Sequence, residues 1–485
     1  MRIQLCKALL ALMGTGLFFT GCNKWEDATS LESPAAANDL LVQIRQHPEL
    51  SRFAELLVQT GYDRVVASSR SFTVFAPTNA ALASLDPAIL GDSVRLRQLV
   101  GNHITTQLFP VRAAAGPLRL QMLNGKYQNL QGSTFEEATI TKGDNYARNG
   151  LLHLIDKVVP VLPNAWESLE GGTGMPTAQR DYLFSLGRRV FDPSRAVQTG
   201  VDSVGNPVYQ PGTDSVSTNL FWNRVHDLRH EQEQFTVFLL ADDAWEAEVA
   251  RYNSFFITGT ADSTRDLSRW AVARDLVVEG RYEPGTLPDT LLSKFHAKMG
   301  IDRSAIAQTI RTSNGLIHIM NRLEVRPKDK FGPYLIQAEN YRTASADRRG
   351  NTYLRDRVNP MTGKPFRDVL VYNHGLALFN LGYRLSEVPS GKYRAYWVAL
   401  NDNINNMAGS NASFSFSQKL GIGSPTSALL PYVPVTLRNY NEVYLGEFTL
   451  SQYYPVLDVF LTAANSGAAN VNPLVCDYIR IEPVF

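Results

Sequence analysis

The chain has 485 residues and, at about 150 residues per domain, is long enough for roughly three domains. Hydrophobic residues make up 44% of it and charged residues 19%, so each domain can bury a core and none needs to be disordered. The formal net charge is only +1, which argues against nucleic acid or an anionic membrane face as the main partner.

The first residues have the form of a secretory signal. Arg2 and Lys7 precede an apolar run at 8–19, which is too short to cross a membrane as a helix because a bilayer needs about 20 apolar residues. The sequence therefore predicts a signal peptide over 1–21 that is cleaved.

Cys22 directly follows this signal. The tetrapeptide FTGC at 19–22 resembles the lipobox of bacterial lipoproteins, which implies that Cys22 is acylated, becomes the mature N-terminus and anchors the chain in a membrane. The alternative is an ordinary secretory signal that ends near a cysteine. NKWED at 23–27 resembles the surface-export signal of Bacteroidetes lipoproteins. We therefore expect a tether over 22–37 and an outer-membrane lipoprotein exposed on the cell surface, with the periplasmic face as the alternative.

The three cysteines leave no intramolecular disulfide in the mature chain. Cys6 is removed with the signal and Cys22 carries the lipid, so that only Cys476 remains as a thiol. It lies in the apolar run LVCDYIRI, which predicts a thiol buried in a strand. Stability must then come from packing.

Two motifs repeat in the same order along the first two thirds of the chain. SFTVFAPTNAAL at 71–82 recurs as QFTVFLLADDAW at 234–245, and NGLLHLIDKVVPV at 149–161 recurs as NGLIHIMNRLEVRP at 314–327. The offsets are nearly equal, at 234 − 71 = 163 and 314 − 149 = 165 residues. This spacing indicates a tandem duplication of one domain.

The first motif predicts a buried strand that ends at Pro77, followed by a helix that Thr78 caps. In the second motif, Asn149 and Gly150 are typical of a tight hairpin turn, since both tolerate positive φ.

The strand after each turn carries one histidine, His153 in the first copy and His318 in the second. We expect each to bond a backbone group and not a metal, because no Cys or acid recurs at ligand spacing.

TVFAPTNAAL, LRQLVGNHI at 96–104 and NGLLHLIDKVV resemble the signature motifs of the fasciclin domain. The resemblance covers 38–163, and a divergent copy over 166–328 lacks a counterpart of His103. It implies α+β domains with a role in extracellular adhesion and no catalytic site. The second copy also contains an insertion at 192–217, whose turn formers predict an extended loop or an added hairpin.

Charge, Gly and Pro in KDKFGP at 328–333 predict a domain boundary. Many short strand-like runs follow, separated by turn segments, which favours an all-β sandwich or jelly roll over 333–485. The predicted fold class is therefore α+β: two tandem fasciclin-like α+β domains followed by an all-β sandwich.

IQAENY at 336–341 and CDYIRI at 476–481 resemble the opening and closing strands of family 6 carbohydrate-binding modules and related galactose-binding-like sandwiches. The resemblance implies that the two chain ends lie side by side. It also implies a structural calcium near the acids of these strands, which nominates Glu339 and Asp477 as ligands. Ca²⁺ prefers such oxygen ligands. No other cofactor is expected.

Sugar binding needs exposed aromatic rings, which stack on pyranose rings beside Asn, Asp or Gln. Two segments supply candidates. The candidates are Tyr372, Asn373 and His374 in a predicted loop, and Tyr453 and Tyr454 before Pro455. Ordinary packing is the alternative for each aromatic, and we expect Trp397 to lie in the core.

The sequence contains no nucleophile elbow, HExxH, P-loop or dinucleotide-binding motif. We therefore expect a non-catalytic adhesion or ligand-binding lipoprotein of the cell surface, in which fasciclin domains present the sandwich to a glycan or a surface protein. The alternatives are an accessory component of an outer-membrane glycan-uptake system and a polysaccharide-active enzyme.

Overall fold

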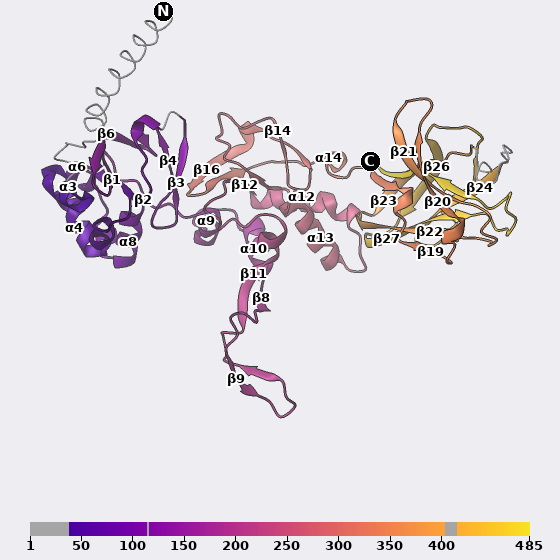
Figure 1. Ribbon diagram of the computed structural model, residues 1–485, viewed down its shortest axis with the longest axis horizontal. Helices are drawn as coiled ribbons and strands as arrows, with labels where there is room; N and C mark the ends of the chain where they lie inside the picture. Colours follow the sequence, from indigo (N-terminus) through magenta and orange to yellow (C-terminus); the bar gives the residue numbers. More distant parts are fainter. Residues whose placement is uncertain (1–37, 114–115, 403–414) are drawn as a thin grey trace, which may run out of the picture. The chain divides into compact units, whose positions relative to one another are not determined.

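The computed structural model describes residues 38–113, 116–402 and 415–485 (Figure 1). The signal and tether predicted over 1–37, with Cys22, lie outside these residues. The described chain forms two compact units. The first contains the residues up to Ser168 together with Arg229–Gln234 and Arg311–Gly315, and the second contains the rest. The α+β fold class is confirmed, since helices and sheets alternate before a C-terminal part built of strands.

The first unit is built on a seven-stranded sheet with the order β2-β1-β7-β6-β5-β4-β3. Strand β1 (Phe72–Pro77), the second in this order, is buried along its length and runs parallel to β7 (Gly150–Ile155). The other strands are β2 (Ile104–Thr106), β3 (Leu118–Gln121), β4 (Tyr127–Gln131), β5 (Thr134–Phe135) and β6 (Ala138–Ala147). The helices are α3 (Leu40–Gln46), α4 (Ser51–Thr60), α5 (Tyr62–Val66), α6 (Asn79–Leu82), α7 (Pro87–Leu90) and α8 (Ser93–Gly101).

The predicted cap of α6 is confirmed, because Thr78 Oγ1 accepts a hydrogen bond from Ala81 N at 3.3 Å. This helix is short and ends at Leu82. A new helix, α7, starts at Pro87 and is capped by Asp86.

The predicted tight hairpin is present, since Ala147 of β6 pairs with Gly150 of β7 across the turn residues Arg148 and Asn149. Neither Asn149 nor Gly150 has the positive φ that the sequence suggested. Asn149 is also a buried bracket. Its Oδ1 accepts from Leu40 N at 2.9 Å and its Nδ2 donates to Val66 O at 2.7 Å, so that it joins the first helix to the sheet. Residue 150 must be glycine because the backbone of β1 passes close to it, and a Cβ at this position would lie 2.2 Å from Phe72 O.

The second copy carries a four-stranded sheet with the order β13-β12-β17-β16, which repeats the order β2-β1-β7-β6 of the first. Its strands are β12 (Phe235–Leu240), β13 (Val277–Glu279), β16 (Ile306–Thr312) and β17 (Gly315–Met320). Asn314 repeats the bracket as well, since its Oδ1 accepts from Ala165 N at 2.8 Å. The other elements are α9 (Ala165–Gly171), α10 (Ala178–Ser185), α11 (Leu220–Arg224), α12 (Asp242–Tyr252), α13 (Ala261–Ala273), β14 (Thr290–Leu292) and β15 (Lys298–Gly300).

Both strand histidines bond a backbone group, as expected. The Nε2 of His153 lies 3.0 Å from Phe109 O, and the Nε2 of His318 lies 2.9 Å from Tyr282 O, so both rings donate to backbone carbonyls. Burial lowers the pKa of each ring, which keeps it neutral.

The insertion forms an added hairpin, as predicted. β8 (Gly187–Phe191) pairs with β11 (Ser215–Asn219), and β9 (Gln198–Val201) pairs with β10 (Pro207–Tyr209). Figure 1 shows it as a magenta arm that leaves the second copy beside α10. The Phe191 and Tyr209 rings, 5.2 Å apart, join the two pairs of strands.

The C-terminal part is a sandwich of a four-stranded sheet, β18-β29-β23-β26, and a five-stranded sheet, β19-β22-β27-β24-β25, with a third sheet, β20-β21-β28, at one end. The first sheet contains β18 (Tyr334–Gln337), β23 (Gly391–Val398), β26 (Val443–Leu450) and β29 (Tyr478–Val484). The second contains β19 (Thr343–Ala344), β22 (Asn380–Val388), β24 (Phe416–Ile422), β25 (Val433–Val435) and β27 (Tyr454–Ala463). The third contains β20 (Thr352–Val358), β21 (Pro365–Val371) and β28 (Leu474–Cys476).

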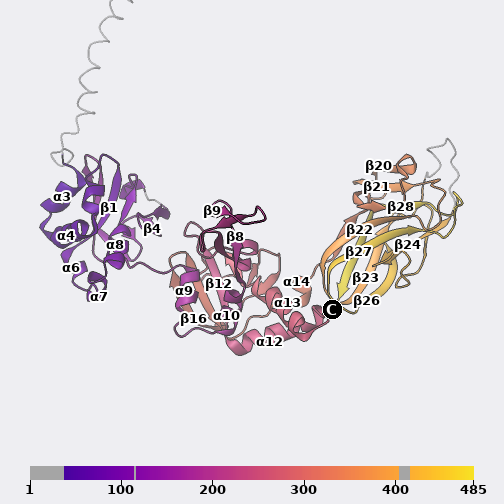
Figure 2. The same cartoon turned by 90° about the horizontal axis from the view of Figure 1, so that it is seen from below.

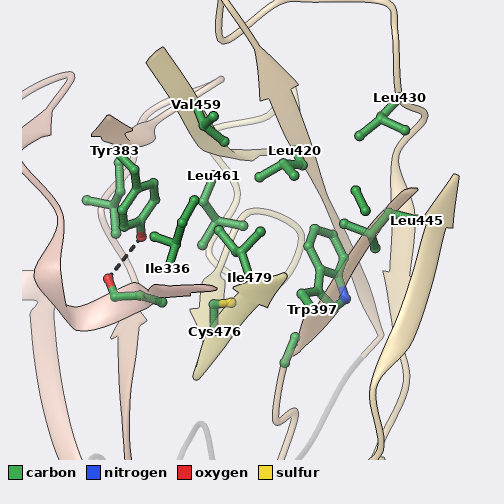
Figure 3. Close-up of a cluster of buried hydrophobic side chains, with 14 of the residues drawn as sticks. Ile336, Tyr383, Trp397, Leu420, Leu430, Leu445, Val459, Leu461, Cys476 and Ile479 are labelled. Atoms are coloured by element: carbon green, nitrogen blue, oxygen red, sulfur yellow. Dashed lines mark hydrogen bonds between the residues drawn. The ribbon is translucent and has the colours of Figure 1, made fainter. Parts of the chain in front are cut away.

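Side chains from both large sheets meet in one apolar core (Figure 3). Trp397 and Cys476 are fully buried there, as predicted. Tyr383 brings a hydroxyl into the same core and donates it to Ala338 O at 2.9 Å, so its polar end is satisfied.

A buried ion pair holds the segment that leads into the sandwich. Lys330, the last residue of α14 (Pro327–Lys330), binds the carboxylate of Asp275 and the carbonyl of Ala271. The side chains of Lys330 and Asp275 are only 2% and 1% exposed. Ser293 Oγ donates to the same carboxylate at 2.6 Å. The KDKFGP segment is therefore fixed to the second copy at Lys330.

Replacing Lys330 with Met should lower the free energy of unfolding by about 3–5 kcal/mol, because the Asp275 charge would stay buried without its partner. The measurement is urea denaturation followed by circular dichroism. Lys328→Met is the matched control, since Lys328 is exposed on the same helix and should change the free energy by less than about 0.5 kcal/mol. Equal stabilities of the two variants would contradict the role given to the ion pair.

Candidate functional site

The first and last strands of the sandwich pair with each other, as the sequence predicts. β18 and β29 are antiparallel, with Ile336 opposite Ile479 and Gln337 opposite Tyr478. Immediately beyond this ladder, Ala338 N donates to Asp477 O at 2.8 Å. The pairing therefore brings Asp477 to the turn that carries Glu339.

These two acids interact electrostatically. The pKa of Asp477 is raised to about 6, mainly by burial and further by the charges of Asp368 and Glu339. Glu339 Oε2 is buried and has no hydrogen-bond partner among the described residues. The structure therefore places both predicted calcium ligands in one poorly solvated region.

Asp368, the third acid of this region, is balanced by arginines. It is fully buried on β21, where Arg355 Nε donates to its Oδ1 at 2.8 Å and Arg357 Nη1 donates to its Oδ2 at 3.2 Å. Arg357 also binds Asp402, whose Oδ2 accepts from the Tyr440 hydroxyl at 2.7 Å. Two arginines thus neutralise two aspartates. Glu339 interacts electrostatically with Arg367, which is already paired with Asp356, so the charges of Glu339 and Asp477 are only partly balanced.

Two partly balanced carboxylates, one of which has an oxygen without a hydrogen-bond partner, fit part of a calcium site. Among the residues that the structure describes, no group of three or more His, Cys, Asp or Glu side chains is arranged to hold a metal. Ca²⁺ takes six to eight oxygen ligands, so carbonyls and water would have to complete the set around Glu339 and Asp477. A bound ion would let Asp477 ionise. Calcium here stays a prediction.

The five predicted sugar contacts do not share one surface. Strand β22 pairs with β27, with Asn380 opposite Thr462 and Val388 opposite Tyr454. Residues 372–374 precede the Asn380 end, while Tyr454 lies eight residues away at the other end, about 27 Å along the strand.

His374 supports its loop from inside. It is 2% exposed, its Nε2 donates to Asn472 O at 2.7 Å, and its ring lies 4.7 Å from that of Phe379. Its Nδ1 accepts from Leu376 N at 3.3 Å. Both ring nitrogens are therefore used within the domain, and a ligand contact by His374 is not supported. Its neighbour Asn373 is exposed, with φ 56°.

The other predicted aromatics pack against protein. Tyr453 N donates to Ile257 O at 2.8 Å, and its ring lies 5.3 Å from that of Phe256, both in the second unit. Tyr454 is half-buried against the sandwich core, and so is Tyr372 at the far end of the strands. Alternation in the sequence could not distinguish these environments.

The structure adds a polar hollow of about 290 Å³ beside residues 372–374. Its lining includes one tyrosine, three arginines, an aspartate and a threonine: Tyr341, Arg342, Asp347, Arg348, Arg349 and Thr352. Arg348 Nε donates to His374 O at 2.9 Å, so the hollow and the loop are continuous. The sequence signal that could have found it is one tyrosine with three arginines within 341–349.

No helix within the described parts of the chain combines the length and the apolar character that crossing a membrane requires.

Residues 48–161 match the family model described as "Fasciclin domain". Among curated proteins, transforming growth factor-beta-induced protein ig-h3 of Oryctolagus cuniculus is 28% identical over 152 residues, which cover 28% of this chain and 21% of the relative. The protein of the same name from Sus scrofa is 34% identical over 107 residues, which cover 19% of this chain and 15% of the relative. The chain therefore spans about a fifth or less of the length of these relatives.

Three solved structures are similar to parts of the chain. A FAS1 domain pair from the insect cell adhesion molecule fasciclin I has 16% identity and a TM-score of 0.24, and covers 58% of this chain and 98% of that structure. A family 35 carbohydrate-binding module from Clostridium thermocellum has 16% identity and a TM-score of 0.21, with 31% and 98% covered. A family 6 module from Clostridium stercorarium, solved with cellobiose, has 15% identity and a TM-score of 0.20, with 31% and 94% covered.

The first compact unit thus contains a fasciclin domain, in the residues 48–161 that match. The strand order of the second copy repeats that of the first, and the C-terminal strands form a β-sandwich.

Replacing Asp477 with Asn tests the acid pair. The pKa of Asp477 is raised in the folded chain, so folding favours the protonated acid and this contribution is lost as pH rises through about 6. Asn resembles the protonated acid. In EGTA, Asp477→Asn should therefore match the wild type at pH 4 and exceed its stability at pH 8 by about 1 kcal/mol, allowing for partial exposure. Thermal unfolding measures the difference.

Calcium should reverse this order at pH 8, because only the wild type keeps both carboxylates. Asp356→Asn is the control. Asp356 on β20 pairs with Arg367 on β21 at the exposed surface, so this variant should be no more stable than the wild type at pH 8. A wild type that is more stable than Asp477→Asn in EGTA would refute the electrostatic argument. A midpoint that calcium leaves unchanged would refute the metal prediction.

Proposed function

We propose that this chain is a non-catalytic lipoprotein of the outer-membrane surface, in which fasciclin domains present the C-terminal sandwich to a glycan. Glycan binding is supported by one observation: the loop 372–374 adjoins the polar hollow through Arg348, which lines the hollow and donates to His374 O. The fasciclin match at 48–161 supports an adhesive role, and the lipobox-like tetrapeptide before Cys22 supports the anchor.

The chemistry of this surface suits a sugar. Tyr341 and Tyr372 are half-buried, which leaves part of each ring for stacking on a pyranose face. Asn373 and Thr352 add an amide and a hydroxyl, which can donate to and accept from sugar hydroxyls. Asn351 Nδ2 donates to Tyr372 O at 3.1 Å and to Asn373 O at 2.9 Å, so the loop is held before a ligand arrives.

The hollow is also positively charged. Three of its lining residues are arginines and one is an aspartate, whereas the whole chain carries a net charge of only +1. Guanidinium groups bind carboxylates and sulfates through paired hydrogen bonds. The proposed ligands therefore include glycans with acidic sugars.

Tyr341→Ala and Tyr372→Ala should each weaken glycan binding about tenfold, since the loss of one stacked ring costs on the order of 1.4 kcal/mol. A glycan array and affinity electrophoresis with neutral and acidic polysaccharides would measure it on the full chain carrying Cys22→Ala. Tyr454→Ala is the matched control, because Tyr454 is a half-buried tyrosine at the opposite end of β27. An array without binding, or equal losses for all three variants, would count against the site.

Cys22→Ala should move the protein from the membrane fraction to the soluble fraction, because a chain without acyl groups loses its hydrophobic anchor. Fractionation with immunoblotting measures this, and protease shaving of intact cells reports which face the wild type occupies. Lys24→Ala is the control for membrane attachment, since it leaves the acylated cysteine in place. Persistent membrane association of Cys22→Ala would exclude the lipid anchor.

A further inference from the structure

The fasciclin domain in the first unit contains an open apolar groove of about 810 Å³. Its lining comes from helices α6, α7 and α8 and from the segment that follows β7. Figure 2 shows these three helices as neighbours in the first unit. The lining of the groove is mainly aliphatic and includes Ala81, Leu85, Ile89, Leu99, Val158 and Pro160. The groove shares no residue with the hollow that is proposed to bind a glycan.

The second copy shows what fills the equivalent space. Two backbone hydrogen bonds fix the equivalence, because Thr78 N donates to Ile155 O in the first copy and Ala241 N donates to Met320 O in the second. Pro160 lies five residues after Ile155, and Val325 lies five residues after Met320, so Pro160 of the groove corresponds to Val325.

In the second copy, Tyr252 occupies this place. Helix α12 runs without a break from Asp242 to Tyr252, so its last turn reaches the segment that contains Val325. Tyr252 is fully buried, and its hydroxyl donates to Val325 O at 2.5 Å. Lys330 Nζ lies 5.0 Å from the ring centroid. An aromatic side chain with a polar tip is therefore the native filling of this space in one copy.

The first copy lacks this filling because its helix is broken. α6 ends at Leu82, and Asp86 and Pro87 start a separate short helix. Proline at this point removes a backbone donor and prevents one continuous helix. Counted from Thr78 and Ala241, Ile89 is the residue that corresponds to Tyr252. The aliphatic walls are left without the ring that would cover them.

The polar end of the space is already satisfied in the first copy. Asn124 Nδ2 donates to Gln98 O at 3.2 Å and to Asn102 Oδ1 at 3.0 Å. In the second copy, Lys330 makes the corresponding contacts with Ala271 O and the Asp275 carboxylate. Asn102 carries no charge, so an occupant of the first groove needs no cation.

The rim of the groove is also electrically neutral. Asp86 and Asp156 supply two negative charges, and Arg95 and Lys157 supply two positive charges. A charged ligand would gain nothing from this balance, whereas a neutral apolar group would gain from covering the walls.

We propose that the groove binds a tyrosine side chain from an uncharged segment of a partner protein. The ring takes the position that Tyr252 takes in the second copy. The ring lies against the aliphatic walls. Its hydroxyl donates to the carbonyl of Pro160, which already accepts from Asn102 Nδ2 at 3.3 Å and has a second lone pair. This interaction is independent of glycan binding by the sandwich.

The probe is N-acetyl-L-tyrosinamide, which presents a neutral tyrosine side chain between two amides. Saturation-transfer NMR with the full chain carrying Cys22→Ala should show transfer to the tyrosine ring. Ser84→Phe places a ring in the groove and should lower the affinity at least tenfold. Ala83→Phe is the matched control, since Ala83 is exposed next to Ser84 and does not line the groove. It should bind as the wild type does.

Circular dichroism establishes that both variants fold. Absence of saturation transfer in the wild type, or equal affinities of Ser84→Phe and Ala83→Phe, would overturn the proposal. N-acetyl-L-leucinamide tests the chemistry, because it should bind at least fivefold more weakly. Equal binding of the leucine and tyrosine probes would also overturn the proposal, since the groove would then be a general apolar site.

Discussion

Four residue pairs between β18 and β29 close the C-terminal sandwich, and the arrangement of its acids depends on them. The first and last strands are about 140 residues apart in sequence, so their pairing costs considerable loop entropy that the apolar core must offset. It also carries Asp477 toward Glu339. The nearby arginines are already paired, since Arg355 and Arg357 bind Asp368 and Asp402, and Arg367, which interacts with Glu339 electrostatically, pairs with Asp356. The same contact thus stabilises the fold and creates an unbalanced charge.

Much of the fold could be predicted from local sequence. The Thr78 cap, the buried Cys476 and the added hairpin of the insertion all follow from residue types at short range. The roles of Asn149 and His374 could not be predicted in this way. Asn149 binds Leu40, over a hundred residues earlier, and His374 binds Asn472, so each role is set by a distant part of the chain that no local pattern contains.

The candidate site was predicted only in part for the same reason. The resemblance of the two end motifs to a known family implied that the first and last strands lie side by side, and β18 and β29 do pair. The aromatic residues were harder to place. Tyr453 packs on Phe256, whereas Tyr372 packs against the sandwich core, and this difference depends on how separate elements meet.

Cys476 has a practical consequence. Its thiol is buried in the sandwich core, and burial raises its pKa well above the ordinary value, so a thiol reagent cannot react with it in the closed domain. In a chain with Cys22 replaced and the signal removed, it is the one remaining thiol of the sequence. The rate at which a maleimide labels Cys476 therefore reports how often the sandwich opens, so this thiol is an internal probe of local unfolding.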